Sequence, residues 1–420
     1  MTIVSLETPA YDQPVIAVTA QSFAQVTAQM PFVLTKAFSY ALKLQYGSLT
    51  VTLPDGKRYG FAATNAGPAA EITIHDLGFG KRLLKGGEIG FAEAYIAGEW
   101  DTPDLTAFLY LFCVNHDAVV AVLPGNPLVK LLQRLRHWLN RNSKRGSKRN
   151  IHAHYDIGNA FYSQWLDRTM TYSAAIYAPG DNDLASAQTR KYRVLAESGG
   201  FKPGDHVLEI GCGWGGFAEF AARELGCKVT ALTISQEQFD YARKRIQDAG
   251  LADRVEIKLQ DYRDETGTYD RIASIEMFEA VGEQYWPGYF RQLCDRLKPG
   301  GTAAVQIITI QEKFWEGYRS EMDFIRHYIF PGGMLPTPAR LDSLGADHGL
   351  TRVSQTIFGL DYARTLSDWR VQFRAVWPNL KPLGFDERFR RLWEYYYAYC
   401  EAGFRSEKID VRQIVYAKAR

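Results

Sequence analysis

The chain has 420 residues, 46% of them hydrophobic, and carries 49 Lys and Arg against 47 Asp and Glu, a formal net charge of +2. A chain this apolar is not intrinsically disordered, and its length exceeds what one core usually holds, so about two domains are expected. The near balance of charge argues against a dedicated nucleic-acid binder, which usually shows a basic surplus.

The cysteines are widely spaced and form no Cys-x-x-Cys pair, which argues against a disulfide framework or a zinc cluster and suits a reducing cytoplasm. The first ten residues lack the basic and apolar regions of a signal peptide, and no apolar run is long enough to span a membrane. We therefore expect a cytoplasmic protein that meets a membrane only peripherally, from its inner face.

Residues 1–122 are predicted to form a leading α+β domain with a docking or dimerisation role. Residues 49–53 are β-rich and precede the turn signal Pro54-Asp55-Gly56, and residues 71–76 alternate like a second strand. Helical patterns follow around residues 91–97 and 105–114.

Residues 123–150 are predicted to be a basic amphipathic linker. Leucines and Trp138 recur at helical spacing between residues 128 and 142, and no Asp or Glu occurs from residue 118 to residue 155. The eight basic residues of 130–149 leave 41 basic against 47 acidic residues elsewhere, a net of −6. The segment either lies on anionic lipid or is a solvated helix that packs its leucines on its own protein.

Residues 151–420 are predicted to be an α/β domain with a Rossmann-like, doubly wound, mainly parallel sheet. Strands are expected at 206–210, 228–232, 255–259, 271–275 and 302–308. Helices are expected at 217–225, 236–249 and 289–297, the last one stopped by Lys298-Pro299-Gly300-Gly301. Residues 365–419 are predicted to be aromatic-rich helix.

A glycine-rich loop, Gly211-Cys212-Gly213-Trp214-Gly215-Gly216, lies between a predicted strand and a predicted helix, where doubly wound sheets bind ligands. Its G-x-G-x-G spacing differs from the G-x-G-x-x-G of dinucleotide sites. Glu209 precedes the loop, and its carboxylate would repel a pyrophosphate but can bind a cation such as the amino end of S-adenosylmethionine. The loop therefore favours S-adenosylmethionine over NAD.

Besides the glycine-rich loop, residues 154–159, 170–173, 233–238, 277–282 and 328–333 form specific motifs. Together these motifs resemble the cyclopropane fatty-acyl-phospholipid synthases and their mycolic acid methyltransferase relatives, and the resemblance covers most of residues 150–420. Residues 90–101 also resemble the leading domain of longer bacterial members.

The resemblance implies S-adenosylmethionine as the methyl donor. Tyr172 and Ser173 would close over it, and Thr233 with Gln238 would hold its ribose side. Asp261 and Tyr262 would lie near the adenine. The cofactor-binding residues implied are Tyr172, Ser173, Glu209, Gly211, Cys212, Gly213, Trp214, Gly215, Thr233, Ser235, Gln238, Asp261 and Tyr262.

The substrate implied is the cis double bond of an unsaturated acyl chain in a membrane phospholipid. An alkene is a weak nucleophile, so the donor methyl must be held in line with it. Attack leaves a carbocation, and a base must remove a proton before a ring can close. In the family a bicarbonate ion serves this purpose, held by a glutamate, a histidine, a tyrosine and backbone amides.

Glu279 matches that glutamate and Tyr362 that tyrosine, whereas Gln306 stands at the histidine position and Ala174 at a cysteine position. The backbone amides of Ala174 and Ile308 survive such changes, but Gln306 supplies neither positive charge nor a proton shuttle. Bicarbonate binding is therefore left open. Cyclopropanation is the favoured outcome, and methyl-branched or methylene products are alternatives.

Cys400 matches a cysteine once proposed as a nucleophile in the family, but direct methyl transfer needs no covalent enzyme intermediate, so we interpret it as structural. His152 and His154 lack a third ligand cluster, and no metal site is expected. The partner expected is unsaturated phospholipid in an anionic membrane, with a homodimer possible and no nucleic acid. A non-catalytic lipid-binding homologue and a small-molecule methyltransferase are the competing functions.

Overall fold

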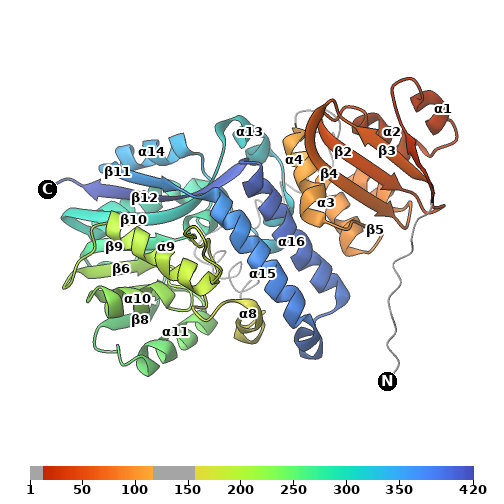
Figure 1. Ribbon diagram of the computed structural model, residues 1–420. Helices are drawn as coiled ribbons and strands as arrows, with labels where there is room; N and C mark the ends of the chain where they lie inside the picture. Colours follow the sequence, from red (N-terminus) through yellow and green to blue (C-terminus); the bar gives the residue numbers. More distant parts are fainter. Residues whose placement is uncertain (1–12, 117–156) are drawn as a thin grey trace. The chain divides into compact units, whose positions relative to one another are not determined.

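The computed structural model describes residues 13–116 and 157–420. The chain divides into two compact units, residues 1–129 and residues 130–420 (Figure 1). The basic linker predicted at 123–150 and the pair His152 and His154 lie outside the described residues. Within the described ranges, no helix is long and apolar enough to cross a membrane.

The first unit is a five-stranded sheet in the order β1-β3-β2-β4-β5, accompanied by four helices in the described part. Its elements are β1 (Val15–Ala17), α1 (Phe23–Thr27), α2 (Phe32–Ala41), β2 (Tyr46–Thr52), β3 (Arg58–Ala62), β4 (Asn65–Ile74), α3 (Phe79–Ile96), β5 (Trp100–Asp101) and α4 (Leu105–Val114). Buried Trp100 stacks on Phe91 with ring centroids 4.5 Å apart. The predicted α+β class is confirmed, and the docking or dimerisation role stays a prediction.

The second unit begins its described part with two helices and then alternates strands with helices. Its first half comprises α8 (Asn159–Trp165), α9 (Leu184–Ser198), β6 (His206–Ile210), α10 (Gly216–Glu224), β7 (Lys228–Thr233), α11 (Gln236–Asp248), β8 (Val255–Leu259), η1 (Tyr262–Asp264) and β9 (Tyr269–Ile275). Its second half comprises η2 (Phe278–Ala280), η3 (Glu283–Tyr285), α12 (Trp286–Arg296), β10 (Leu297–Ile310), α13 (Glu312–Ser320), η4 (Ile325–Ile329), α14 (Pro338–Asp347), β11 (Leu350–Ile357), α15 (Gly359–Leu380), η5 (Lys381–Leu383), α16 (Glu387–Arg405) and β12 (Ile409–Lys418).

The sheet of this unit has seven strands in the order β11-β12-β10-β9-β6-β7-β8. Strands β10, β9, β6, β7 and β8 run parallel, and β12 runs antiparallel to both of its neighbours. The predicted Rossmann-like, mainly parallel sheet is confirmed. The chain winds from β6 outward through β7 to β8 and then returns to β9 on the other side of β6. This reversal marks the carboxyl ends of β6 and β9 as the ligand-binding edge.

The predicted helix stop at residues 298–301 is confirmed, because α12 ends at Arg296. Residues 298–301 lie within β10, where the pairing with β9 shifts register between Leu297 and Thr302. One local prediction is wrong. The helix expected up to residue 419 ends at Arg405, and Ile409–Lys418 form β12 instead. Because β12 is an inner strand with apolar side chains on both faces, its sequence lacks the period-two alternation of a half-buried strand.

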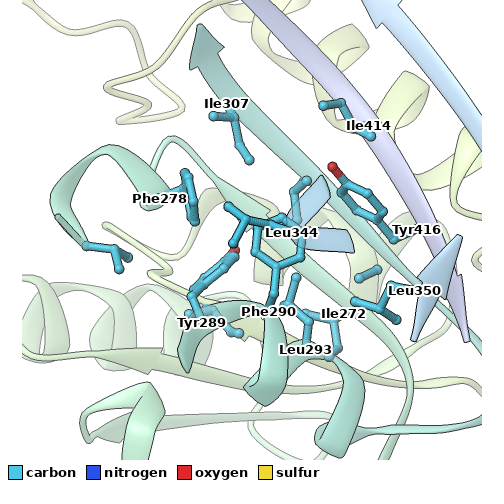
Figure 2. Packing of buried hydrophobic residues seen from close by; sticks show 14 of the residues in the cluster. Ile272, Phe278, Tyr289, Phe290, Leu293, Ile307, Leu344, Leu350, Ile414 and Tyr416 are labelled. Atoms are coloured by element: carbon cyan, nitrogen blue, oxygen red, sulfur yellow. The ribbon is translucent and has the colours of Figure 1, made fainter. Parts of the chain in front are cut away.

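A large hydrophobic cluster fills one face of this sheet. Figure 2 shows Phe290 and Leu293 of α12 beside Ile272 of β9, with Tyr416 of β12 nearby. A second group of packed side chains is aromatic and lies at α15 and α16, which run alongside each other (Figure 1). Within that group Phe161 of α8 contacts Trp393 of α16 at a centroid distance of 4.8 Å. The α8 segment is thereby fixed to the C-terminal helices.

Candidate active site

The glycine-rich loop leaves β6 at the ligand-binding edge and begins α10. Gly211 has φ 83° and Gly215, which caps α10, has φ 82°, a left-handed conformation that glycine adopts without strain. A Cβ atom at Gly211 would lie 2.7 Å from Cγ of Met277. The N–H groups of Gly211 and Cys212 donate to the carbonyl oxygen of Leu232, at 3.0 and 2.9 Å. The loop therefore presents bare backbone at the edge.

Trp214 is held by Asn159, the last residue of the family motif at residues 154–159. Its Nε1 donates to Oδ1 of Asn159 at 2.6 Å, and Nδ2 of Asn159 donates to Oε2 of Glu237 at 3.1 Å. One asparagine at the start of α8 thus joins the glycine-rich loop to the start of α11.

Glu209 is the penultimate residue of β6 and is only 3% exposed. Its Oε2 is buried and has no hydrogen-bond partner among the described residues. Burial raises the pKa of its carboxyl to about 8, against the opposing influence of Arg245 and Lys191. An unsatisfied carboxyl oxygen beside a bare glycine loop fits the ammonium group of S-adenosylmethionine, which would satisfy it.

Tyr172 and Ser173, predicted to close over the cofactor, are both held from other elements. The hydroxyl of Tyr172 donates to that of Tyr396 at 2.8 Å. Lys191 Nζ donates to Oγ of Ser173 at 2.7 Å, and Gln188 Nε2 donates to its carbonyl oxygen at 2.8 Å. Both α9 residues are fully buried, and burial lowers the pKa of Lys191 to about 7.

Sequence reasoning missed Lys191 and Gln188. A lysine and a glutamine in an amphipathic helix are ordinarily solvent-facing. Only their spacing of three residues, which places them on one helix face, could have suggested a shared target.

The residues predicted for the ribose and adenine sides lie after β7 and β8. Thr233 donates to Oε1 of Gln238 at 2.9 Å, and Ser235 Oγ caps α11 by accepting from the backbone N–H of Gln238 at 3.3 Å. Asp261 accepts from Nε and Nη2 of Arg263 at 2.8 and 2.6 Å. Tyr262 packs edge-on against Tyr289 at a centroid distance of 5.6 Å. Their cofactor roles stay predictions.

Glu279 lies in η2, just beyond β9, and contacts Ile308, the other residue that the resemblance places at the bicarbonate site on this side. The backbone N–H of Ile308 donates to Oε1 of Glu279 at 2.5 Å. The other carboxyl oxygen is buried without a hydrogen-bond partner in the described part of the chain. Burial, followed by the nearby Glu276, raises the pKa of Glu279 to about 8, so its carboxyl group is mostly neutral at pH 7.

Tyr362 and Gln306 do not converge on Glu279. Both contact Glu276, a residue that sequence reasoning missed. The Tyr362 hydroxyl donates to Oε2 of Glu276 at 2.7 Å, and Gln306 Nε2 donates to Oε1 at 2.8 Å. The backbone N–H of Ala174 also donates to Oε1, at 2.8 Å. Three groups expected to hold bicarbonate are therefore engaged by a side-chain carboxylate, and in this arrangement bicarbonate does not fit.

Cys400 lies on α16, and burial raises the pKa of its thiol, which keeps it protonated. Because a protonated thiol is a poor nucleophile, Cys400→Ala is expected to leave the rate of methyl transfer unchanged. Single-turnover assays with radiolabelled methyl donor would measure this rate. A variant that folds, by circular dichroism, but transfers no methyl group would restore a catalytic role for the thiol.

A mainly parallel, seven-stranded sheet with a glycine-rich loop and a buried acid at its switch point defines an S-adenosylmethionine-dependent methyltransferase. Residues 142–414 match the mycolic acid cyclopropane synthetase family. The chain is 40% identical over 384 residues to the tuberculostearic acid methyltransferase UfaA1 of Mycobacterium tuberculosis, covering 87% of this chain and 86% of the relative. It is 34% identical over 388 residues to the cyclopropane-fatty-acyl-phospholipid synthase of Escherichia coli, covering 88% and 95%. The chain belongs to this family of S-adenosylmethionine-dependent lipid methyltransferases.

Solved structures agree with this assignment. The cyclopropane synthase MmaA2 of Mycobacterium tuberculosis is 28% identical, with a TM-score of 0.61 over 64% of this chain and 98% of that one. The mycolic acid cyclopropane synthase CmaA1, complexed with SAH and CTAB, is 27% identical, with the same TM-score and coverage. The predicted family and methyl donor are confirmed.

Proposed function

We propose that the protein transfers a methyl(ene) group from S-adenosylmethionine to the cis double bond of unsaturated acyl chains in membrane phospholipids, with cyclopropane fatty acids as the main product. The observation that carries the proposal is the cluster around Glu276 and Glu279, which lies directly after β9. The neighbouring strand end carries the glycine-rich loop, and Met277 touches the position of Gly211. A methyl donor and proton-accepting groups would therefore meet at one edge of the sheet.

S-adenosylmethionine, when bound, supplies an electrophilic methyl group on a positively charged sulfur. Glu209 would bind its ammonium group, and the backbone of Gly211 and Gly213 would line it. Tyr172 and Ser173 would cover it, because Tyr396 and Lys191 fix their positions. Exclusion of water by these side chains would protect the carbocation from hydration.

A methylene or methyl-branched product is the second candidate, because the relative at 40% identity is a tuberculostearic acid methyltransferase. A hydride shift before proton loss would move the cation to the methylated carbon, and loss of a methyl proton would then give a methylene group. A saturated methyl branch would require an added hydride from a separate reductant.

The partner proposed is phospholipid at an anionic membrane face, bound peripherally from the cytoplasmic side. The eight basic residues of 130–149, among which no acid occurs, favour such a surface. A homodimer formed through the first unit is a further part of this proposal. Its basis is the separate compact fold of that unit.

The test is to incubate the purified protein with S-adenosylmethionine and vesicles of unsaturated phospholipid, and to analyse the acyl chains by mass spectrometry after chromatography. The expected product is heavier by one CH₂ and co-elutes with a cyclopropane standard. Co-elution with a methylene standard of equal mass would select the second candidate. Unchanged lipids would reject lipid methylation. Binding of the donor without lipid turnover would then favour a small-molecule methyltransferase, and no binding a non-catalytic homologue.

A further inference from the structure

The carboxylate of Glu276 is surrounded by hydrogen-bond donors from three distant parts of the chain. These are the backbone N–H of Ala174, Nε2 of Gln306 on β10, and the hydroxyl of Tyr362 on α15, at 2.7 to 2.8 Å. Burial raises the pKa of Tyr362 well above its usual value, so this hydroxyl keeps its proton and donates. Burial raises the pKa of Glu276, but Lys191 and these three donors oppose that rise by stabilising the ionised form, and a lone pair stays free on Oε2.

Gln306 is itself held in the orientation that donates to Glu276. Gln413 of β12 donates through Nε2 to Oε1 of Gln306 at 3.1 Å, which turns the NH₂ group of Gln306 toward the carboxylate. The two glutamines are register partners across β10 and β12. The NH₂ group of Gln306, which can only donate, is thus aimed at the carboxylate by the neighbouring strand.

The backbone of Glu276 is strained in a way that points to function. Its φ is 48°, a left-handed conformation shared by only two other non-glycine residues in the described ranges, Met170 and Glu407. Such a conformation is unfavourable for a side chain larger than glycine and persists where the surroundings fix it, often at active sites. As a residue Glu276 is partly exposed, whereas Ala174, Gln306 and Tyr362 are buried.

We propose that Glu276 is a built-in carboxylate that takes the place of bicarbonate as the base of the reaction. The proposal rests on the proposed function. The alkene electron pair forms a bond to the methyl carbon as the carbon–sulfur bond breaks, which leaves a carbocation on the acyl chain. Oε2 of Glu276 then takes a proton from the added methyl group, and the freed electron pair closes the ring, or forms a methylene group after a hydride shift. Glu276 finally passes the proton to water.

Glu279 is the less suitable base. One donor, the N–H of Ile308, contacts its carboxyl group, compared with three for Glu276. A carboxyl group with one donor and one unsatisfied oxygen is held mainly in its neutral form. It therefore suits positioning of Ile308 and the chain beside it more than proton removal.

The test uses Glu276→Gln, which keeps the shape, and Glu276→Gly, which suits the left-handed φ and removes the carboxylate. Each is expected to lower turnover by roughly 100-fold or more, the contribution typical of a general base, with the affinity for S-adenosylmethionine unchanged. Sodium formate or bicarbonate is expected to restore part of the turnover of Glu276→Gly, which a purely structural loss would not allow. The matched control is Glu256→Gln, at an exposed ion pair with Lys258 on β8, and it should behave as the parent. Full turnover in Glu276→Gln would overturn the proposal.

Bicarbonate binding gives a readout independent of turnover. Titration with ¹³C-bicarbonate, followed by NMR line broadening, is expected to show no saturable site in the parent protein and a site in Glu276→Gly. Turnover of the parent should also be the same in bicarbonate-free buffer. A saturable site in the parent that Tyr362→Phe removes would overturn the proposal. A parent protein that methylates no lipid would reject the proposed function, and the titration would still decide whether Glu276 fills the anion position.

Discussion

Glu209→Gln is expected to weaken the binding of S-adenosylmethionine by roughly 100-fold, because it removes a charged hydrogen bond worth about 3 kcal/mol in a buried site. The carboxyl group of Glu209 has a pKa of about 8 without the cofactor, so it must release a proton to pair with the ammonium group. Affinity should therefore fall as the pH drops from 8 to 6, by up to about tenfold per pH unit.

Isothermal titration calorimetry in buffers of different ionisation enthalpy would measure both the affinity and the proton release. The proton release should disappear in Glu209→Gln.

The raised pKa of Glu209 also predicts a dependence of protein stability on pH. The folded protein keeps this proton while the unfolded chain loses it above its ordinary pKa of 4.5. The contribution of Glu209 to the free energy of unfolding is therefore fully present below pH 4.5 and is lost as the pH rises toward 8. In thermal unfolding, the stability of Glu209→Gln should not fall in this way between pH 4.5 and 8, whereas the stability of the control Glu256→Gln should fall as in the parent. Equal cofactor affinity in parent and Glu209→Gln would contradict the assignment.

Gly211→Ala is expected to destabilise the protein by about 2–4 kcal/mol and to abolish cofactor binding. The alanine would have to keep a backbone φ of 83°, and its Cβ would lie 2.7 Å from Cγ of Met277. The same methyl group would also stand where the loop presents bare backbone to the ligand. Chemical denaturation and cofactor titration would measure the two effects.

Gly288→Ala is the matched control for this substitution. Gly288 lies on the exposed face of α12, and a Cβ there would meet no heavy atom within 4 Å. Alanine at an open helical position is expected to stabilise by roughly 0.5–1 kcal/mol. If Gly211→Ala unfolds at the same denaturant concentration as the parent, the close approach at Met277 has no energetic weight.

Local features of the chain could be predicted well. The strand 206–210, the glycine-rich loop and the strand 255–259 depend on hydrophobic period and glycine spacing, which act over a few residues, and the structure has both strands at these bounds. The family motif pointed to Glu279 and to the backbone amide of Ile308 separately, but only the structure shows their contact.

The centre of the site could not be predicted in the same way. Glu276 immediately follows a buried strand, and nothing in its neighbours distinguishes it from any acid that ends a strand. Its importance arises because the fold brings Ala174, Gln306 and Tyr362 to one carboxylate from far along the chain. Lys191 and Gln413 were missed for the same reason, since their partners are set by sheet register and helix packing.

The position of β12 has a consequence for biosynthesis. This strand follows β10 and β11 along the chain, yet it is inserted between them, and its Gln413 aims the amide of Gln306 at Glu276. A ribosome completes the glycine-rich loop and five parallel strands well before it reaches this segment. The nascent chain could therefore acquire its cofactor half early, while the proton-accepting half would be assembled only once β12 emerges and enters the sheet. Catalytic competence would thus be withheld until synthesis of this unit is finished.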